Sequence, residues 1–292
     1  MDPLIIIPAL GDNFIYLYQY DSSSALVVDP SDSSSVLTII KRRKLCLTTI
    51  LITHHHWDHI AGTAELKSKT RCRVVGGDKQ RIPGIDHVVN DGQILTIGDA
   101  KIQVIATHGH TRTSVCYYLL PRLATRDAEA SMKPSSNNRS GILWTGDTLF
   151  VGGCGRVLEC DAQVMLNSLR KLASLPDQTL VYCGHDYTVE NYEFALSIEP
   201  DNQAVKQRLH QIKQAQKDGP PRFALPAASS RDESRGGWQS EEAGIPSTIL
   251  QERITNPFLR ADVPELKEVL HMPQAPPTEI FAELRRRKDA FY

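Results

Sequence analysis

Four histidines and an aspartate stand within six consecutive residues of this chain, His54-His55-His56-Trp57-Asp58-His59. The apolar run at 48–53 predicts a β-strand, so the cluster begins where a strand ends. Because His54 and His56 lie two residues apart, extended backbone turns both side chains to the same side. Packing gives no reason to gather imidazoles and a carboxylate here, whereas Zn²⁺ and similar ions prefer these ligands. The segment therefore predicts a metal site at a strand end.

Three later strand ends each place one further candidate ligand directly after a glycine. The candidates are His110, Asp147 and His185, and they follow strands predicted over 101–106, 141–145 and 179–182. Strand ends can meet at one edge of a sheet, where their side chains assemble a metal site. We expect His55 to point away from this site and His108 to be a neighbour of it rather than a ligand.

The order of the predicted elements indicates an α/β fold. Further strands are predicted over 4–10, 14–20, 25–28, 73–75 and 115–120, and helices over 36–43 and 162–175. Hairpins mixed with strand–helix units predict an αββα sandwich over residues 1–185. Helices predicted over 189–198, 203–217 and 278–290 indicate a small helical domain over 186–292. Two stretches rich in Ser, Pro, Gly and charge, 122–140 and 218–247, are predicted to be loops, the second of them flexible.

Composition limits the partners and the cellular location that are expected for such a protein. Lys and Arg total 33 against 34 Asp and Glu, so no overall field attracts nucleic acid or an anionic membrane. No apolar run approaches the roughly 20 residues that cross a bilayer. The six cysteines form no CxxC pair, and the first residues do not resemble a secretory signal. We therefore expect a cytoplasmic monomer that binds neither nucleic acid nor membrane.

The spacing of the candidate ligands resembles that of the metallo-β-lactamase superfamily. Within it, the chain resembles the glyoxalase II group, the hydroxyacylglutathione hydrolases. The stretches that carry this second likeness are Pro8–Leu10 with Asp12–Asn13, Trp144–Phe150, Gly153–Arg156, Cys183–Thr188, Asn256–Arg260 and Leu284–Asp289. Residues 111–118 look most like those of fungal cytosolic members.

The resemblance implies two divalent metal ions. By the family pattern one ion is held by His54, His56 and His110, the other by Asp58, His59 and His185, and Asp147 bridges the two. Zinc is the expected metal, with iron and manganese as alternatives. A metal ion lowers the pKa of bound water from about 15.7 towards 7, which supplies hydroxide at neutral pH. Asp58 would orient this hydroxide and is the expected catalytic residue.

The resemblance also implies an activity and a substrate. The activity is hydrolysis of S-D-lactoylglutathione and other S-(2-hydroxyacyl)glutathiones to glutathione and D-lactate or its analogue, the second step of methylglyoxal detoxification. The positions that recognise glutathione in the family correspond here to Arg156, Leu158, Tyr187, Arg285 and Lys288. Arg285 and Lys288 share a helix face, and an alternative is that they only complement the helix dipole.

Three residues depart from the family pattern. His108 replaces a usual Pro, Cys160 replaces a usual Gly, and Leu158 stands where the family often has an aromatic side chain. A hydroxyl lost at position 158 removes one hydrogen bond, worth about 0.5–1.5 kcal/mol. We therefore expect weaker substrate affinity but no loss of a metal ligand.

Two other functions compete with the hydrolase at this point. An iron-dependent glutathione persulfide dioxygenase needs one metal, so the complete second set of ligands argues against it. A non-enzymatic relative would have a vestigial site, and the presence of every proposed ligand argues against that.

Overall fold

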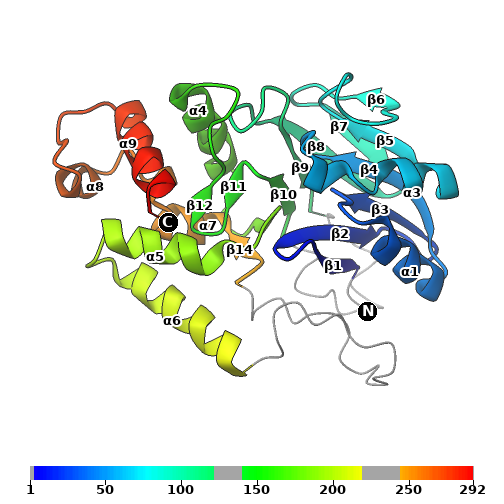
Figure 1. The fold of residues 1–292 in the computed structure, drawn as a ribbon, viewed down its shortest axis with the longest axis horizontal. Helices are drawn as coiled ribbons and strands as arrows, with labels where there is room; N and C mark the ends of the chain where they lie inside the picture. The colour runs from blue at the N-terminus through cyan, green and yellow to red at the C-terminus, as the bar shows by residue number, and fades with distance from the viewer. Residues whose placement is uncertain (1–2, 122–139, 219–243, 292) are drawn as a thin grey trace, which may run out of the picture.

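Two six-stranded sheets lie face to face in the structure, a computed structural model that describes residues 3–121, 140–218 and 244–291 (Figure 1). The first sheet has the order β1 (Leu4–Ala9), β2 (Asn13–Gln19), β3 (Ser24–Val28), β4 (Cys46–Ile52), β5 (Arg73–Gly76) and β6 (His87–Val88). The second has the order β14 (Ser247–Thr248), β13 (Leu180–Cys183), β10 (Ile142–Gly146), β9 (Val115–Leu119), β8 (Ala100–Ala106) and β7 (Ile94–Ile97). From β3 to β6 the first sheet is parallel. In the second sheet β10 and β13 are parallel.

Helices cover the outer face of each sheet. On the first sheet these are α1 (Ser33–Arg43) and α3 (Thr63–Thr70), and on the second α4 (Ala162–Ala173) and α9 (Pro277–Asp289) (Figure 1). A one-turn helix, α2 (Trp57–Ile60), follows β4, and a hairpin of β11 (Leu149–Phe150) and β12 (Gly153–Cys154) follows β10. The αββα sandwich predicted from the sequence is confirmed.

Alternating side chains divide each central strand between two hydrophobic cores. In β2, Tyr16 lies in the core between the sheets, whereas Leu17 lies in the core under α1 and α3. In β10, Trp144 joins the core between the sheets and Leu143 the core under α4 and α9. A strand whose two faces are both covered shows this division because successive side chains point to opposite faces. All five residues of β10 are buried for this reason.

The C-terminal region packs onto the second sheet. Its further helices are α5 (Thr188–Ile198), α6 (Gln203–Asp218), α7 (Ile249–Thr255), a 3₁₀ turn (Pro257–Leu259) and α8 (Pro264–Val269). Strand β14 pairs with β13, so this region adds an edge strand to the sandwich. Tyr192 of α5 lies in the core between the sheets, and Phe281 of α9 lies in the core under α4. The change of secondary structure at residue 186 is therefore not a break in the hydrophobic core.

Most predicted elements are found with their ends shifted by one or two residues. The strand predicted over 4–10 ends at Ala9, because Leu10 adopts a left-handed φ of 50°. The loops predicted at 122–140 and 218–247 fall mainly on 122–139 and 219–243, which lie outside the described residues. Within the described residues, no helix is long and apolar enough to cross a membrane.

Candidate metal centre

The predicted ligands come together where four strands end. His54 and His56 follow β4, and α2 turns Asp58 and His59 back towards them. The remaining ligands follow β8, β10 and β13, which end at the same edge of the sandwich, and they are His110, Asp147 and His185. The seven side chains form one cluster, as the sequence predicts. Its donor atoms fall into groups whose members lie within 4.8 Å of one another, among them His54–His56–His110 and Asp58–His59–His185.

Nitrogen atoms of neighbouring rings point at each other across this cluster. His56 Nδ1 lies 3.1 Å from His54 Nε2 and 3.0 Å from His110 Nε2. His59 Nε2 lies 3.2 Å from His185 Nε2. These contacts define a nitrogen-lined centre in each group.

Asp147 lies between the two groups. Its Oδ2 is 3.5 Å from His110 Nε2 and 3.4 Å from His185 Nε2, and its Oδ1 is 3.3 Å from His59 Nε2. Asp147 Oδ1 is buried and accepts no hydrogen bond from the described residues. A buried carboxylate oxygen without a donor is costly unless a cation meets it. The carboxylate thus occupies the position expected of a bridging ligand.

Hydrogen bonds on the outer side of two of these rings fix the position of the ring proton. His110 Nδ1 lies 2.9 Å from the Arg156 carbonyl, and His185 Nδ1 lies 2.9 Å from Asp12 Oδ1. A carbonyl or carboxylate oxygen only accepts, so each Nδ1 carries the proton and each inward Nε2 is a lone pair in the neutral ring. Lone pairs about 3 Å apart repel, and a cation between them removes the repulsion. The residues present therefore fit a bound metal, whose histidine ligands are held in this way.

Asp29 organises a ligand in each group, and the sequence analysis missed it. Its Oδ2 lies 3.0 Å from His59 Nδ1 and accepts the Thr53 hydroxyl at 2.6 Å. Because that hydroxyl donates to Asp29, its oxygen accepts from His54 Nδ1, 3.1 Å away. Asp29 directly follows β3, which is the same strand-end position that marks the predicted ligands. That signal was in the sequence, but it could not tell a ligand from a residue that orients one.

The β1–β2 turn supports the cluster from another side. Asp12 holds His185, as described above, and Asn13 Nδ2 donates to the Asp58 carbonyl at 2.9 Å and to Asp58 Oδ2 at 3.4 Å. The Asp12–Asn13 pair was part of the family likeness in the sequence, without a role. The structure gives it one, because it connects the first hairpin to Asp58 and His185.

The carboxylates of the cluster favour positive charge on the neighbouring imidazoles. Burial opposes protonation of His59, but Asp147 and Asp29 outweigh it and raise its pKa to about 10. Burial also opposes charge on His185, yet hydrogen bonds to Asp147 and Asp58 raise its pKa to about 11. For Asp58, burial disfavours ionisation, while the His185 and His59 imidazoles lower its pKa to about 2. Cations bound here would supply the charge that these imidazoles otherwise carry.

Close packing around the ligands requires glycine at two points. A Cβ on Gly184 would lie 2.5 Å from Asp147 Oδ1 and 2.7 Å from His59 Cε1. A Cβ on Gly155 would lie 1.9 Å from the Asp147 carbonyl oxygen. Side chains at these positions would displace Asp147, which for Gly184 explains why a glycine directly precedes His185.

Neither His55 nor His108 joins the cluster. His55 Nε2 lies 3.0 Å from Arg81 Nη1 on the outer side of the loop, and Arg81 also pairs with Glu159. His108 is exposed, and its carbonyl accepts the Ser168 hydroxyl at 2.6 Å.

The five residues predicted to bind substrate fall into two groups. Three lie beside the cluster or are exposed to solvent, and two lie on α9 and contact backbone carbonyls. Tyr187 stacks on His185 with ring centroids 5.0 Å apart, while Arg156 and Leu158 are exposed, Leu158 by 56%. Arg285 is buried and donates Nη1 to the Cys154 carbonyl at 2.9 Å. Lys288 donates to the Glu190 carbonyl at 3.1 Å, and burial lowers its pKa to about 8. Arg285 of α9 thus faces β12, and Lys288 faces α5.

Comparison with known proteins agrees with this geometry. Residues 9–121 match the metallo-beta-lactamase superfamily, and residues 186–230 and 228–291 match the family described as hydroxyacylglutathione hydrolase C-terminus. A hydroxyacylglutathione hydrolase of Mesorhizobium japonicum is 39% identical over 96% of both chains. One of Methylococcus capsulatus is 37% identical over 99% of this chain and 98% of that one. The crystal structure of ETHE1 from Myxococcus xanthus covers 99% of this chain and 98% of its own with a TM-score of 0.58 at 22% identity, a likeness of fold.

Proposed function

The chain belongs to the hydroxyacylglutathione hydrolase family, and we propose that it hydrolyses S-D-lactoylglutathione and other S-(2-hydroxyacyl)glutathiones. Water adds to the thioester carbonyl and the carbon–sulfur bond breaks, which releases glutathione and the 2-hydroxy acid. With the lactoyl group the acid is D-lactate, and the reaction is the second step of methylglyoxal detoxification. The observation that carries the proposal is the convergence of two nitrogen-lined centres around Asp147.

Two divalent ions are the cofactors of this proposal. The first would be held by His54, His56 and His110, the second by Asp58, His59 and His185, and both by Asp147. Zinc suits these nitrogen and oxygen donors, and iron and manganese accept the same set, so metal analysis decides between them. Such ions lower the pKa of a coordinated water and polarise a carbonyl oxygen.

Asp58 is the residue that would orient the attacking water. Its low pKa keeps the carboxylate ionised at neutral pH, and Asn13 fixes it from outside. An ionised and fixed carboxylate accepts a hydrogen bond from a water molecule and aims the oxygen lone pair at the substrate carbonyl. The leaving thiol has an ordinary pKa near 8.5, so it departs without a strong general acid.

Glutathione recognition would fall to the region 186–292 and to the loop between β12 and α4. Arg156 offers an exposed guanidinium to a carboxylate, and Tyr187 lies against a ligand ring. Leu158 offers apolar contact only. Arg285 and Lys288 bring further positive charge to the same side through α9, where each also holds a backbone carbonyl. This combination of cations suits the two carboxylates of glutathione.

A reducing compartment fits the cysteines. All six are free thiols in the structure, and four of them are buried. We therefore propose the cytoplasm as the location of the protein. The proposed oligomeric state is a monomer.

Kinetics with metal analysis test the proposal directly. The purified protein should carry two metal ions per chain and hydrolyse S-D-lactoylglutathione, followed by loss of thioester absorbance. Asp58→Asn should lower kcat by about 10²-fold or more. Asp262→Asn is the matched control, because Asp262 pairs with Arg170 on the surface. Full turnover in a metal-loaded Asp58→Asn protein would remove the role of Asp58, and a metal-loaded wild type without thioesterase activity would remove the function.

A second assay distinguishes the competing oxidoreductase. Glutathione persulfide should cause no oxygen uptake, because the curated relatives over the whole length are hydrolases.

A further inference from the structure

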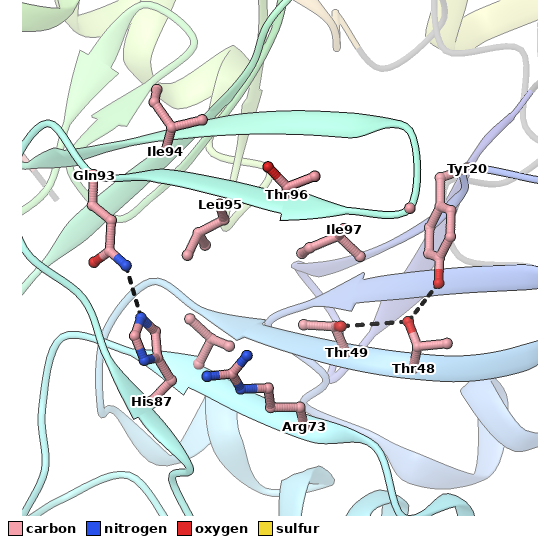
Figure 2. A pocket seen from close by; sticks show the side chains of 12 residues that line it. Tyr20, Thr48, Thr49, Arg73, His87, Gln93, Ile94, Leu95, Thr96 and Ile97 are labelled. Carbon is pink, nitrogen blue, oxygen red and sulfur yellow. Dashed lines mark hydrogen bonds between the residues drawn. The ribbon is translucent and has the colours of Figure 1, made fainter.

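A cavity of about 410 Å³ lies at the end of the sandwich opposite the metal centre (Figure 2). Thr48 and Thr49 near the start of β4, Arg73 at the start of β5 and the whole of β7 line it. The metal ligand His54 comes after the other end of β4. His54 lies five positions along the extended chain from Thr49, about 16 Å at the rise of a strand. The cavity is therefore separate from the metal centre, and its size falls within the range of small-molecule pockets.

No carboxylate is among the residues that line this cavity, although acids and bases are balanced in the chain. Arg73 is exposed and makes no hydrogen bond or ion pair with the residues that the structure describes, and in Figure 2 its guanidinium lies between His87 and Thr49. The neighbouring Asp86 is already satisfied, because it accepts Lys67 Nζ at 2.6 Å and the Val74 amide. The charge of Arg73 acts on Asp86, but its guanidinium makes no hydrogen bond within the described residues, and beside a lining without carboxylates it favours an anionic ligand.

A second donor follows from the hydrogen bonds of Gln93. Its Oε1 accepts the Asn90 amide, so the Nε2 group is the side that donates to His87 Nε2 at 2.8 Å. His87 Nε2 is then an acceptor, and the proton of the neutral ring sits on Nδ1. That proton has no acceptor within the described part of the chain. At the far wall the Tyr20 and Thr48 hydroxyls add no donor, because they lie 2.8 Å apart and Thr48 donates to the Ala25 carbonyl, which leaves the Tyr20 proton to Thr48.

The rest of the lining is mixed, because the polar Thr49 and Thr96 belong to it beside aliphatic side chains. Val75, Leu95 and Ile97 contribute aliphatic surface, and Ile94 is 48% exposed beside them. The turn after β7 closes the wall at Gly98, where a Cβ would lie 2.5 Å from the Tyr20 ring. Aliphatic surface next to a single guanidinium suits a ligand with one negative charge and an apolar body.

We propose that this cavity binds a small monoanionic carboxylate with an apolar body, held by Arg73 and His87 against Val75, Leu95 and Ile97. The planar guanidinium matches a carboxylate with two parallel hydrogen bonds. One cation favours a monoanion over a phosphate dianion. The site is independent of thioester hydrolysis, so it stands or fails without the proposed function.

Benzoate at pH 7 is the probe, and backbone amide shifts in NMR spectra of the full chain are the measurement. We expect millimolar binding, with the shifts centred on Thr48, Gln93 and Ile97. Arg73→Gln should weaken binding by about tenfold. Arg71→Gln is the matched control, because Arg71 is exposed nearby but does not line the cavity. Both variants should keep the wild-type melting temperature and thioesterase activity.

Three further probes separate charge from shape. Benzamide has the shape of benzoate without the charge, acetate has the charge without the ring, and inorganic phosphate has charge alone, so each should bind more weakly than benzoate. Equal benzoate affinity in Arg73→Gln and wild type overturns the proposal. So do shifts centred on the metal centre, phosphate binding as tight as benzoate binding, or no benzoate binding below about 20 mM.

Discussion

The replacement Asp29→Asn tests how the metal centre is held in place. Asp29 accepts three hydrogen bonds, from the Thr53 amide at 2.7 Å, the Thr53 hydroxyl at 2.6 Å and His59 Nδ1 at 3.0 Å. Asparagine has the same shape but only one acceptor oxygen. Its oxygen must stay with the Thr53 amide, which places its NH₂ group where Oδ2 meets His59 and the hydroxyl.

The consequence is that the His59 proton moves to the other ring nitrogen. An NH₂ group donates, so His59 Nδ1 becomes an acceptor and its proton moves to Nε2, the nitrogen that faces the metal centre. The Thr53 hydroxyl also loses its acceptor, which loosens His54. Residues that orient ligands in this way change metal affinity by about 10–100-fold when replaced, or about 1.4–2.7 kcal/mol. We expect Asp29→Asn to lose affinity within that range.

Competition between the apoprotein and a chromogenic chelator for Zn²⁺ measures this loss, and long-range ¹⁵N spectra of the imidazoles report the His59 tautomer. Asp32→Asn is the matched control, because Asp32 caps α1 and asparagine caps a helix equally well. Zn²⁺ affinity within twofold of wild type, with His59 still protonated at Nδ1, would refute the reasoning.

Three further predictions concern packing, burial and charge. Gly184→Ala places a methyl group against Asp147, and we expect lower metal stoichiometry and a loss of about 1–3 kcal/mol in unfolding free energy; unchanged stoichiometry would contradict this. Burial raises the pKa of Glu252, so the folded protein binds its proton more tightly than the unfolded chain does, and stability falls as pH rises above 4.5. Glu252→Gln should remove that fall in urea unfolding at pH 5 and 8, and parallel pH profiles would disprove it. Arg156→Gln should raise KM with kcat and melting temperature unchanged. Arg285→Gln should raise KM and also lower the melting temperature, because Arg285 is buried. An Arg285→Gln protein that melts at the wild-type temperature would contradict the structural part of its role.

The cluster of candidate metal ligands could be predicted from sequence because the pattern of these residues is local. His54, His56, Asp58 and His59 lie within one short segment, and each later ligand directly follows a glycine near a strand end. Strong apolar runs likewise marked the strands, since both faces of the central strands are buried. Such features depend on neighbouring residues and therefore leave a trace in the sequence.

Residues that act through distant pairings left no comparable trace. Asp29 reaches His59 only because β3 pairs with β4, and a sequence does not state which strands are neighbours. Strand β14 has two residues, too few for an alternating pattern, and exists because it pairs with β13. The burial of Arg285 against the Cys154 carbonyl was likewise not predicted, because the sequence indicated only a contact with glutathione or with the helix dipole.

The contacts of Arg285 connect the proposed glutathione-binding region to the candidate metal centre through the backbone. Arg285 holds the Cys154 carbonyl on β12, and two residues later the Arg156 carbonyl accepts the proton of His110 Nδ1. A movement of α9 would thus shift the strand that orients one metal ligand. The same short segment also presents the Arg156 side chain to solvent, where a glutathione carboxylate would bind. The helical region and the sandwich therefore act on one loop, which gives a physical reason for their shared hydrophobic core.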